Sequence, residues 1–170
     1  LTLNTVKHKV DLATIPKDVI TKFSFEAVDI DTTIKISAAL QNLFSKDSYN
    51  VIRFYNAAFK EKLRQLLKQT PFDVVLLETL FVTPYIDCIR KNSNAKIVMR
   101  SQNVEHNIWK RLAKSDKNIF LRLYLSHLSR KLKRYEIEVM EHLDAILPIT
   151  PEDEKSYAML GYKLPMHVTP

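Results

Sequence analysis

Short apolar runs alternate with segments of helical periodicity along this chain, and this alternation constrains the fold more than any other feature. Residues 72–78 are apolar apart from Asp73 and the closing Glu78, a pattern typical of a strand covered on both faces of a parallel sheet. Comparable runs lie at 95–100 and 145–149, each separated from the next by enough chain for a helical crossover. The sequence therefore predicts one α/β domain, Rossmann-like and three-layered, with a mostly parallel sheet.

The remaining periodicities complete this expected order of elements. Strand patterns also cover residues 1–4, 23–30 and 163–170, and the first of them is typical of the tail of a strand, so we expect that strand to begin upstream of Leu1. Helical patterns cover 34–44, 50–68, 80–91, 104–113, a long segment from 117 to 143, and 151–160. Thr150 and Pro151 suit the start of the last helix, and Gly161 suits its end.

Glycine is scarce, and this limits the chemistry that the chain can perform alone. Gly161 is the only glycine among 170 residues, whereas loops that bring phosphate against bare backbone need several. The sequence therefore excludes a Walker A loop and a GxGxxG loop from these residues. The lone Cys88 excludes an internal disulfide and a cysteine-rich zinc site, and it fits a cytoplasmic location.

Polar residues follow the predicted strands at the edge where ligands of parallel sheets bind. Segment 100–106 joins a strand to a helix and contains a cation, two carboxamides, a carboxylate and an imidazole: Arg100, Gln102, Asn103, Glu105 and His106. We expect these residues, together with Glu78, to bind substrate. A purely structural interpretation stays open, in which Asn103 caps the helix, His106 packs or faces water, and Glu78 pairs with Arg100.

A basic segment follows this edge. Residues 110–134 contain nine Lys or Arg and a single acid, Asp116, interleaved with aromatic and aliphatic residues. They indicate either a solvated helix face or a peripheral membrane contact through Lys110, Arg111, Lys114, Lys117 and Arg122. The net charge of +7 favours anionic partners, but no nucleic-acid motif accompanies it, so we expect no nucleic-acid partner.

Two further residue types argue against other chemistry. The five histidines never fall into a metal-ligand spacing, so the sequence predicts no metal site and no cofactor. Cys88 lies between Ile86 and Ile89 in a predicted helix, which favours a buried thiol over a nucleophile.

Several segments together resemble the N-terminal domain of family 4 glycosyltransferases, which are retaining, metal-independent enzymes of the GT-B type. The similarity covers about residues 70–165 and lies in the segments FDVVLLETL, KIVMRSQNVEHNIWKRLA, KLKRYEIEVMEHLDAILPIT and PEDEKSYAMLGYK. Many relatives have His where this chain has Gln102, which cannot accept a proton.

The resemblance implies that residues 1–170 form the acceptor-binding half of a GT-B enzyme that transfers a sugar from a nucleotide-sugar donor. Its acceptor would be a hydroxyl of a glycan or a lipid-linked sugar, as in polysaccharide or glycolipid biosynthesis. Arg100, Asn103, Glu105 and His106 would line the cleft, and the catalytic group stays unassigned. A C-terminal domain would hold most of the donor, and a first strand with its glycine-rich loop would precede Leu1. The 170 residues alone would be inactive.

Two other functions remain open at this stage. The succession DVVLLET, Pro84 and IRKNSNAKIVMRS superficially matches a receiver-type signalling domain, although Glu78 stands where that fold needs a phosphoacceptor Asp. A non-catalytic domain that binds a membrane surface through the basic segment is the other alternative.

Overall fold

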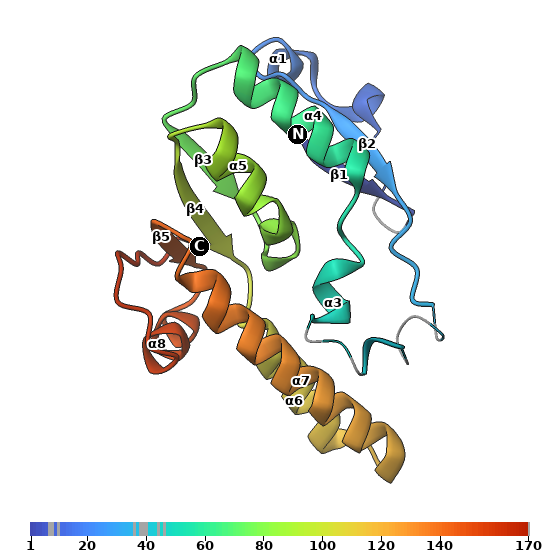
Figure 1. The fold of residues 1–170 in the computed structure, drawn as a ribbon. Coiled ribbons are helices and arrows are strands. Elements are labelled where there is room, and N and C mark those ends of the chain that lie inside the picture. Colours follow the sequence, from blue (N-terminus) through green and yellow to red (C-terminus); the bar gives the residue numbers. More distant parts are fainter. Residues whose placement is uncertain are drawn as a thin grey trace.

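Strands and helices alternate along the chain in the computed structural model (Figure 1), which describes residues 1–6, 9, 11–35, 37, 41–43, 45 and 47–169. This confirms the predicted α/β class. The elements in chain order are β1 (Thr2–Thr5), the 3₁₀ helix η1 (Leu12–Thr14), α1 (Lys17–Ile20), β2 (Ala27–Ile30), α3 (Tyr49–Ile52), α4 (Ala57–Gln69), β3 (Val74–Leu77), the 3₁₀ helix η2 (Leu80–Tyr85), α5 (Ile86–Asn92), β4 (Lys96–Ser101), α6 (Glu105–Ser115), α7 (Ile119–Met140), β5 (Ala145–Pro148) and α8 (Pro151–Met159).

Every strand pair in the described part of the chain is parallel, but the described strands form two separate sheets. β1 pairs with β2, and β3, β4 and β5 form a second sheet with β4 in the middle. A parallel bridge between Ile146 and Met166 extends this second sheet, so the strand predicted near the chain end is present as a short extended segment. The carboxyl ends of β3, β4 and β5 thus meet at one edge.

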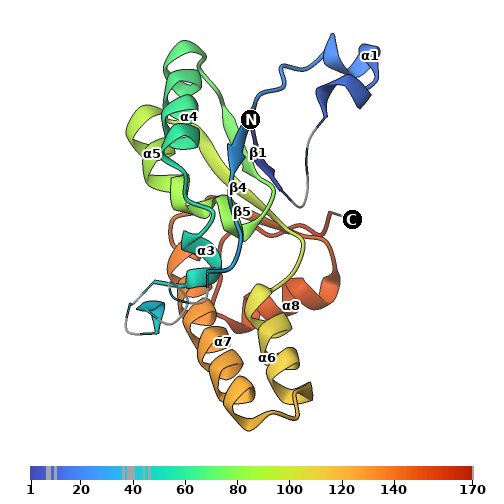
Figure 2. The ribbon, with the colours of Figure 1, turned by 90° about the vertical axis from the view of Figure 1, so that its right-hand side faces the viewer.

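The core lies between the three-stranded sheet and the helices packed on it. Ile97, Met99 and Ile146 of the sheet are fully or almost fully buried, together with Leu132 of α7 and Tyr157 of α8. α4 and α5 lie side by side on one face of the strands (Figures 1 and 2). Burial of these apolar side chains fixes the sheet against its helices.

One face of β3 is uncovered, contrary to the prediction of a strand buried on both faces. Leu77 is buried in the core, but Val74 and Leu76 are 52% and 46% exposed. Successive residues of a strand point to opposite faces, so the face of β3 away from the core is apolar and open. No helix of the described residues covers this face. The prediction was therefore wrong, because a continuous apolar run indicates that both faces are apolar and not that both are covered.

The helix predicted over 50–68 is interrupted. α3 ends at Ile52 and α4 begins at Ala57, with Asn56 as the N-cap whose side chain accepts from the backbone N–H of Phe59 at 3.0 Å. The Tyr85 hydroxyl accepts from the Asn56 N–H at 2.8 Å and donates to the Phe54 carbonyl at 2.9 Å. A buried tyrosine from a distant segment therefore satisfies the backbone at the break.

Two other expected elements are shorter or differ in type. The helix predicted over 80–91 begins as η2, because Pro84 has no N–H to donate back along an α-helix. The strand predicted over 23–30 is formed only in β2. Part of the helix predicted over 34–44, namely residues 36, 38–40 and 44, lies outside the described residues.

The ends of α8 confirm the local prediction. The Thr150 hydroxyl accepts from the Asp153 N–H at 3.1 Å, and Pro151 occupies the first turn. Gly161 has φ +96°, and the N–H groups of Gly161 and Tyr162 donate to the carbonyls of Ala158 and Tyr157 at 3.0 and 3.2 Å. These two bonds form a Schellman motif, which needs the left-handed conformation that glycine adopts without strain.

Candidate functional site

The candidate site lies at the carboxyl edge of the three-stranded sheet. Glu78 directly follows β3, Ser101 ends β4, and Thr150 follows β5 at the start of α8. Because neighbouring parallel strands end at the same edge, residues far apart in the sequence come together there. The structure therefore places Glu78, Arg100, Gln102 and Asn103 at one edge, whereas His106 is buried.

Glu78 and Arg100 form an ion pair across the ends of β3 and β4. Arg100 Nη1 donates to Glu78 Oε2 at 3.3 Å, with the carboxylate exposed and the guanidinium partly buried. The structure thus shows the pairing that the sequence left open. Both groups keep free hydrogen-bonding capacity toward solvent, since a guanidinium carries five N–H donors and a carboxylate several lone pairs.

Gln102 and Asn103 form a short loop whose backbone is held by a hydrogen bond from Ser101. The Ser101 hydroxyl donates to the Asn103 carbonyl at 2.8 Å and lies 2.6 Å from the hydroxyl of buried Tyr157. Both carboxamide side chains are exposed. The loop therefore presents two amides on a backbone that is held in place by α8.

Asn103 is not the cap of α6, which corrects the structural interpretation of this residue. Val104 occupies the N-cap position, where its side chain offers no hydrogen bond. Glu136 of α7 supplies the acceptor instead. Its carboxylate accepts from the backbone N–H of Glu105 at 2.7 Å and from that of His106 at 3.3 Å. A carboxylate from another helix thus satisfies two of the free amides at the start of α6.

His106 lies in the interior, against the same carboxylate. Its ring Nδ1 is hydrogen-bonded to Glu136 Oε2, and both side chains are buried. Ser129 of α7 donates to the His106 carbonyl at 2.9 Å. The His106 ring therefore holds α6 against α7, and it does not lie beside the exposed Gln102 and Asn103.

Glu105 combines partial burial with a neighbouring negative charge. Burial, followed by repulsion from Glu136, raises the pKa of Glu105 to about 7. Its carboxyl can therefore gain or lose a proton near neutral pH, a property that suits a general acid or base. Among the predicted residues, Glu105 has the most strongly altered chemistry.

The raised pKa of Glu105 predicts a pH-dependent stability. Above pH 7 the ionised carboxylate destabilises the fold, whereas below about pH 4.5 the group is protonated in both folded and unfolded chains. We expect Glu105→Gln to stabilise the protein by about 1–2 kcal/mol at pH 8, allowing for partial solvent screening, and hardly at all at pH 4. Urea unfolding at the two pH values measures this. Equal effects at the two pH values would contradict the raised pKa of Glu105.

Sequence reasoning missed Glu136 and Tyr157, although both organise this edge. Glu136 stands four residues after Leu132, and therefore on the apolar stripe of the long helix. An acid in that position indicates a buried partner. Tyr157 carries no comparable signal, because a buried tyrosine hydroxyl ordinarily finds a hydrogen-bond partner but the sequence does not indicate which residue that partner is.

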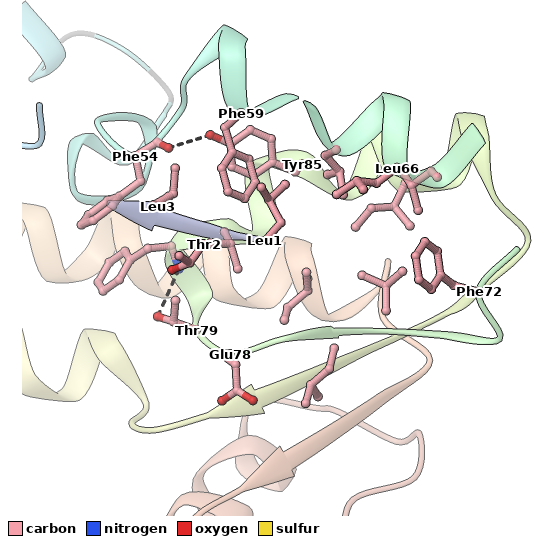
Figure 3. Close-up of a pocket in the computed structure, with 18 of the residues that line it drawn as sticks. Leu1, Thr2, Leu3, Phe54, Phe59, Leu66, Phe72, Glu78, Thr79 and Tyr85 are labelled. Atoms are coloured by element: carbon pink, nitrogen blue, oxygen red, sulfur yellow. Dashed lines mark hydrogen bonds between the residues drawn. The ribbon is translucent and has the colours of Figure 1, made fainter. Parts of the chain in front are cut away.

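A large apolar groove separates the two sheets (Figure 3). It has a volume of about 720 Å³ and is lined by Leu1, by Leu3 of β1, by the residues of β3, and by apolar side chains of α4. Glu78, Thr79 and Gln102 line it as well, so the groove adjoins the candidate site. Figure 3 shows β1 and the segment from Phe72 to Glu78 running in the same direction along it.

The basic residues predicted to face a membrane lie on the hairpin formed by α6 and α7. Lys110, Arg111, Lys114, Lys117 and Arg122 are all exposed. The hairpin extends away from both sheets (Figures 1 and 2), and none of these five residues lines the apolar groove.

Three further features of the described part of the chain concern metal binding, its thiol and membrane spans. No group of three or more His, Cys, Asp or Glu is placed to hold a metal ion. Cys88 is buried, as predicted, and burial raises its pKa. No described helix is both long and apolar enough to cross a membrane.

Comparisons of the chain with protein-family models, with curated proteins and with solved structures found no match.

Proposed function

We propose that this chain is the acceptor-binding half of a retaining glycosyltransferase of the GT-B type. The enzyme would transfer a sugar from a nucleotide-sugar donor to a hydroxyl of a glycan or lipid-linked acceptor. The observation that carries the proposal is the carboxyl edge of the sheet, where Glu78, Arg100, Gln102 and Asn103 present a carboxylate, a guanidinium and two carboxamides. Together they offer donors and acceptors to a polyol.

Glu105 supports this assignment through its position beside the same edge. With a pKa of about 7, the carboxyl can donate a hydrogen bond when protonated and accept one when ionised. A sugar hydroxyl needs both kinds of partner. Glu105 would therefore orient the acceptor, while the leaving phosphate of the donor is stabilised mainly by groups of a second domain.

The groove between the two sheets supports the expected first strand. β1 and β3 run in the same direction on its opposite sides, so one further parallel strand between them would join the sheets in the order β2–β1–strand–β3–β4–β5. In chain order this is 3-2-1-4-5-6, the order of doubly wound nucleotide-binding folds. The strand upstream of Leu1 is proposed to occupy this place.

The open face of β3 supports the same arrangement. β3 connects to β4 through α5, on the face that also carries α4. A right-handed connection from the added strand to β1 moves across the sheet in the opposite direction, and therefore passes over the other face. That is the face on which Val74 and Leu76 are exposed. A crossover helix there would cover them.

The test uses the chain together with the sequence encoded on either side of it. UDP- and GDP-hexoses labelled in the sugar would be offered with oligosaccharide and lipid-extract acceptors. We expect transfer of label, and we expect Arg100→Ala to raise the KM for the acceptor about 10- to 100-fold while the donor KM stays unchanged. Lys91→Ala, an exposed cation on α5, is the matched control. Absence of transfer from every donor would refute the proposal.

The 170 residues alone are predicted to be catalytically inert. They contain a single glycine and hence no glycine-rich loop to hold donor phosphates. We expect no release of UDP or GDP above the buffer rate when the isolated chain is mixed with nucleotide sugars, as followed by a coupled assay. Measurable turnover would mean that donor binding lies within these residues.

A further inference from the structure

The α6–α7 hairpin ends in a cluster of exposed apolar side chains. Phe120 is 80% exposed and Leu123 is 60% exposed, and Leu112, Ile119 and Leu121 are exposed as well. We call these five residues the apolar tip. They lie where α6 ends and α7 begins, at the far end of the hairpin from the sheets (Figures 1 and 2).

The positive charge of the chain is concentrated on the same hairpin. Residues 110–134 hold nine of the 26 Lys and Arg and one of the 19 Asp and Glu. The rest of the chain therefore holds 17 basic and 18 acidic residues, a net charge of −1. All of the positive net charge thus lies within residues 110–134, and the whole hairpin (Glu105–Met140), with nine basic and four acidic residues, carries +5 of the net +7. This concentration makes a solvated face of average composition a poor explanation.

Five of these cations line one groove between α6 and α7, which we call the basic groove. It has a volume of about 480 Å³ and contains Lys110 and Lys114 of α6 with Arg122, Arg130 and Lys133 of α7. No acidic residue lines it, and none of the five forms an ion pair with a described residue. Leu123 joins the groove to the apolar tip.

We propose that the hairpin docks on an anionic phospholipid bilayer, with the apolar tip inserted among the acyl chains and a lipid phosphate held in the basic groove. The hairpin and an anionic membrane surface are complementary. A membrane surface is apolar inside and anionic outside, and the hairpin presents apolar groups at its end and cations behind them in the same order. A free anion would use the groove but leave the tip exposed, and a nucleic acid would use the charges alone.

This proposal goes beyond the transferase function and does not rest on it. The test measures co-sedimentation of the 170-residue chain with vesicles of phosphatidylcholine, or of phosphatidylcholine and phosphatidylglycerol in equal parts. We expect binding to the anionic vesicles, with little binding to the neutral ones. We also expect binding to weaken in 1 M salt, where charges are screened beyond about 3 Å.

Two double variants separate the apolar and ionic contributions. Phe120→Ser with Leu123→Ser should weaken vesicle binding about tenfold or more, whereas Met159→Ser, which removes an 81% exposed side chain from α8, should leave it unchanged. Lys114→Glu with Arg122→Glu should weaken binding roughly a hundredfold. Lys91→Glu with Lys163→Glu makes the same change in net charge at exposed positions elsewhere and should cost only a few-fold.

The outcomes decide between the possible occupants. Equal losses from the two charge variants would show a general charge effect and overturn the docking site. Vesicle binding that is insensitive to the apolar-tip variant, together with tight binding of inorganic phosphate, would assign the basic groove to a free anion. Tighter binding of a single-stranded oligonucleotide than of anionic vesicles would assign it to nucleic acid. All changed side chains are exposed, so unfolding, checked by circular dichroism, is not expected.

Discussion

Glu136→Ala is expected to destabilise the protein by about 3–5 kcal/mol, the effect of removing one partner from a buried charged cluster. The Glu136 carboxylate is 1% exposed, and it accepts hydrogen bonds from two backbone N–H groups of α6 and from the ring of His106. Its removal leaves these donors buried without an acceptor. Urea unfolding at pH 7 measures the change.

A matched control lies on the same helix. Glu138 is exposed on α7, so Glu138→Ala should change the free energy of unfolding by less than about 0.5 kcal/mol. Glu136→Gln keeps the size of the side chain and one carbonyl acceptor, and it should fall between the two alanine variants. If Glu136→Ala were no more destabilising than Glu138→Ala, the proposed role of Glu136 in capping α6 would be wrong.

Tyr157→Ala is the second large expected effect, at about 3–5 kcal/mol. Tyr157 is fully buried in the core, and its hydroxyl lies 2.6 Å from Ser101 Oγ, directly beneath the loop that carries Gln102 and Asn103. Truncation therefore leaves a cavity and also releases this loop. Thermal unfolding, evaluated at the transition, measures the loss.

Tyr157→Phe separates the hydroxyl from the ring. It keeps the packing and removes one hydrogen bond, so it should cost about 1 kcal/mol. It should also weaken acceptor binding in the proposed transferase, because the loop at the sheet edge would be less well held. A Tyr157→Phe loss as large as that of Tyr157→Ala would show that the hydroxyl dominates, contrary to the packing argument.

The sequence predictions agree with the structure where the interactions are local in the chain, and they fail where the interactions join distant segments. Thr150, Pro151 and Gly161 act on backbone within a few residues, and the ends of α8 agree with the prediction. The break between α3 and α4 depends on the hydroxyl of Tyr85, which comes from a distant segment. Helical periodicity alone could not reveal a backbone bond to a residue about thirty positions away.

The candidate site shows the same division. The position of the sheet edge follows from strand order, so residues 78 and 100–106 could be placed there from the sequence. The direction in which each side chain points could not be predicted. Neighbouring helical residues point about 100° apart, so the strand order alone does not tell which of them faces the edge. Only the position of α7 determines that Glu105 lies partly exposed while the adjacent His106 is buried against Glu136.

The separation of the two sheets has a consequence for how the chain opens. β4 and β5 share a ladder and border the core, whereas among the described residues β1 and β2 form strand pairs only with each other. These two strands are held to the rest through contacts such as that between the Asn56 side chain and the Asp29 carbonyl. Amide hydrogen exchange should therefore divide the chain into two cooperative units. The amides of β1 and β2 would exchange through local opening, and those of β4 and β5 only when the whole domain unfolds.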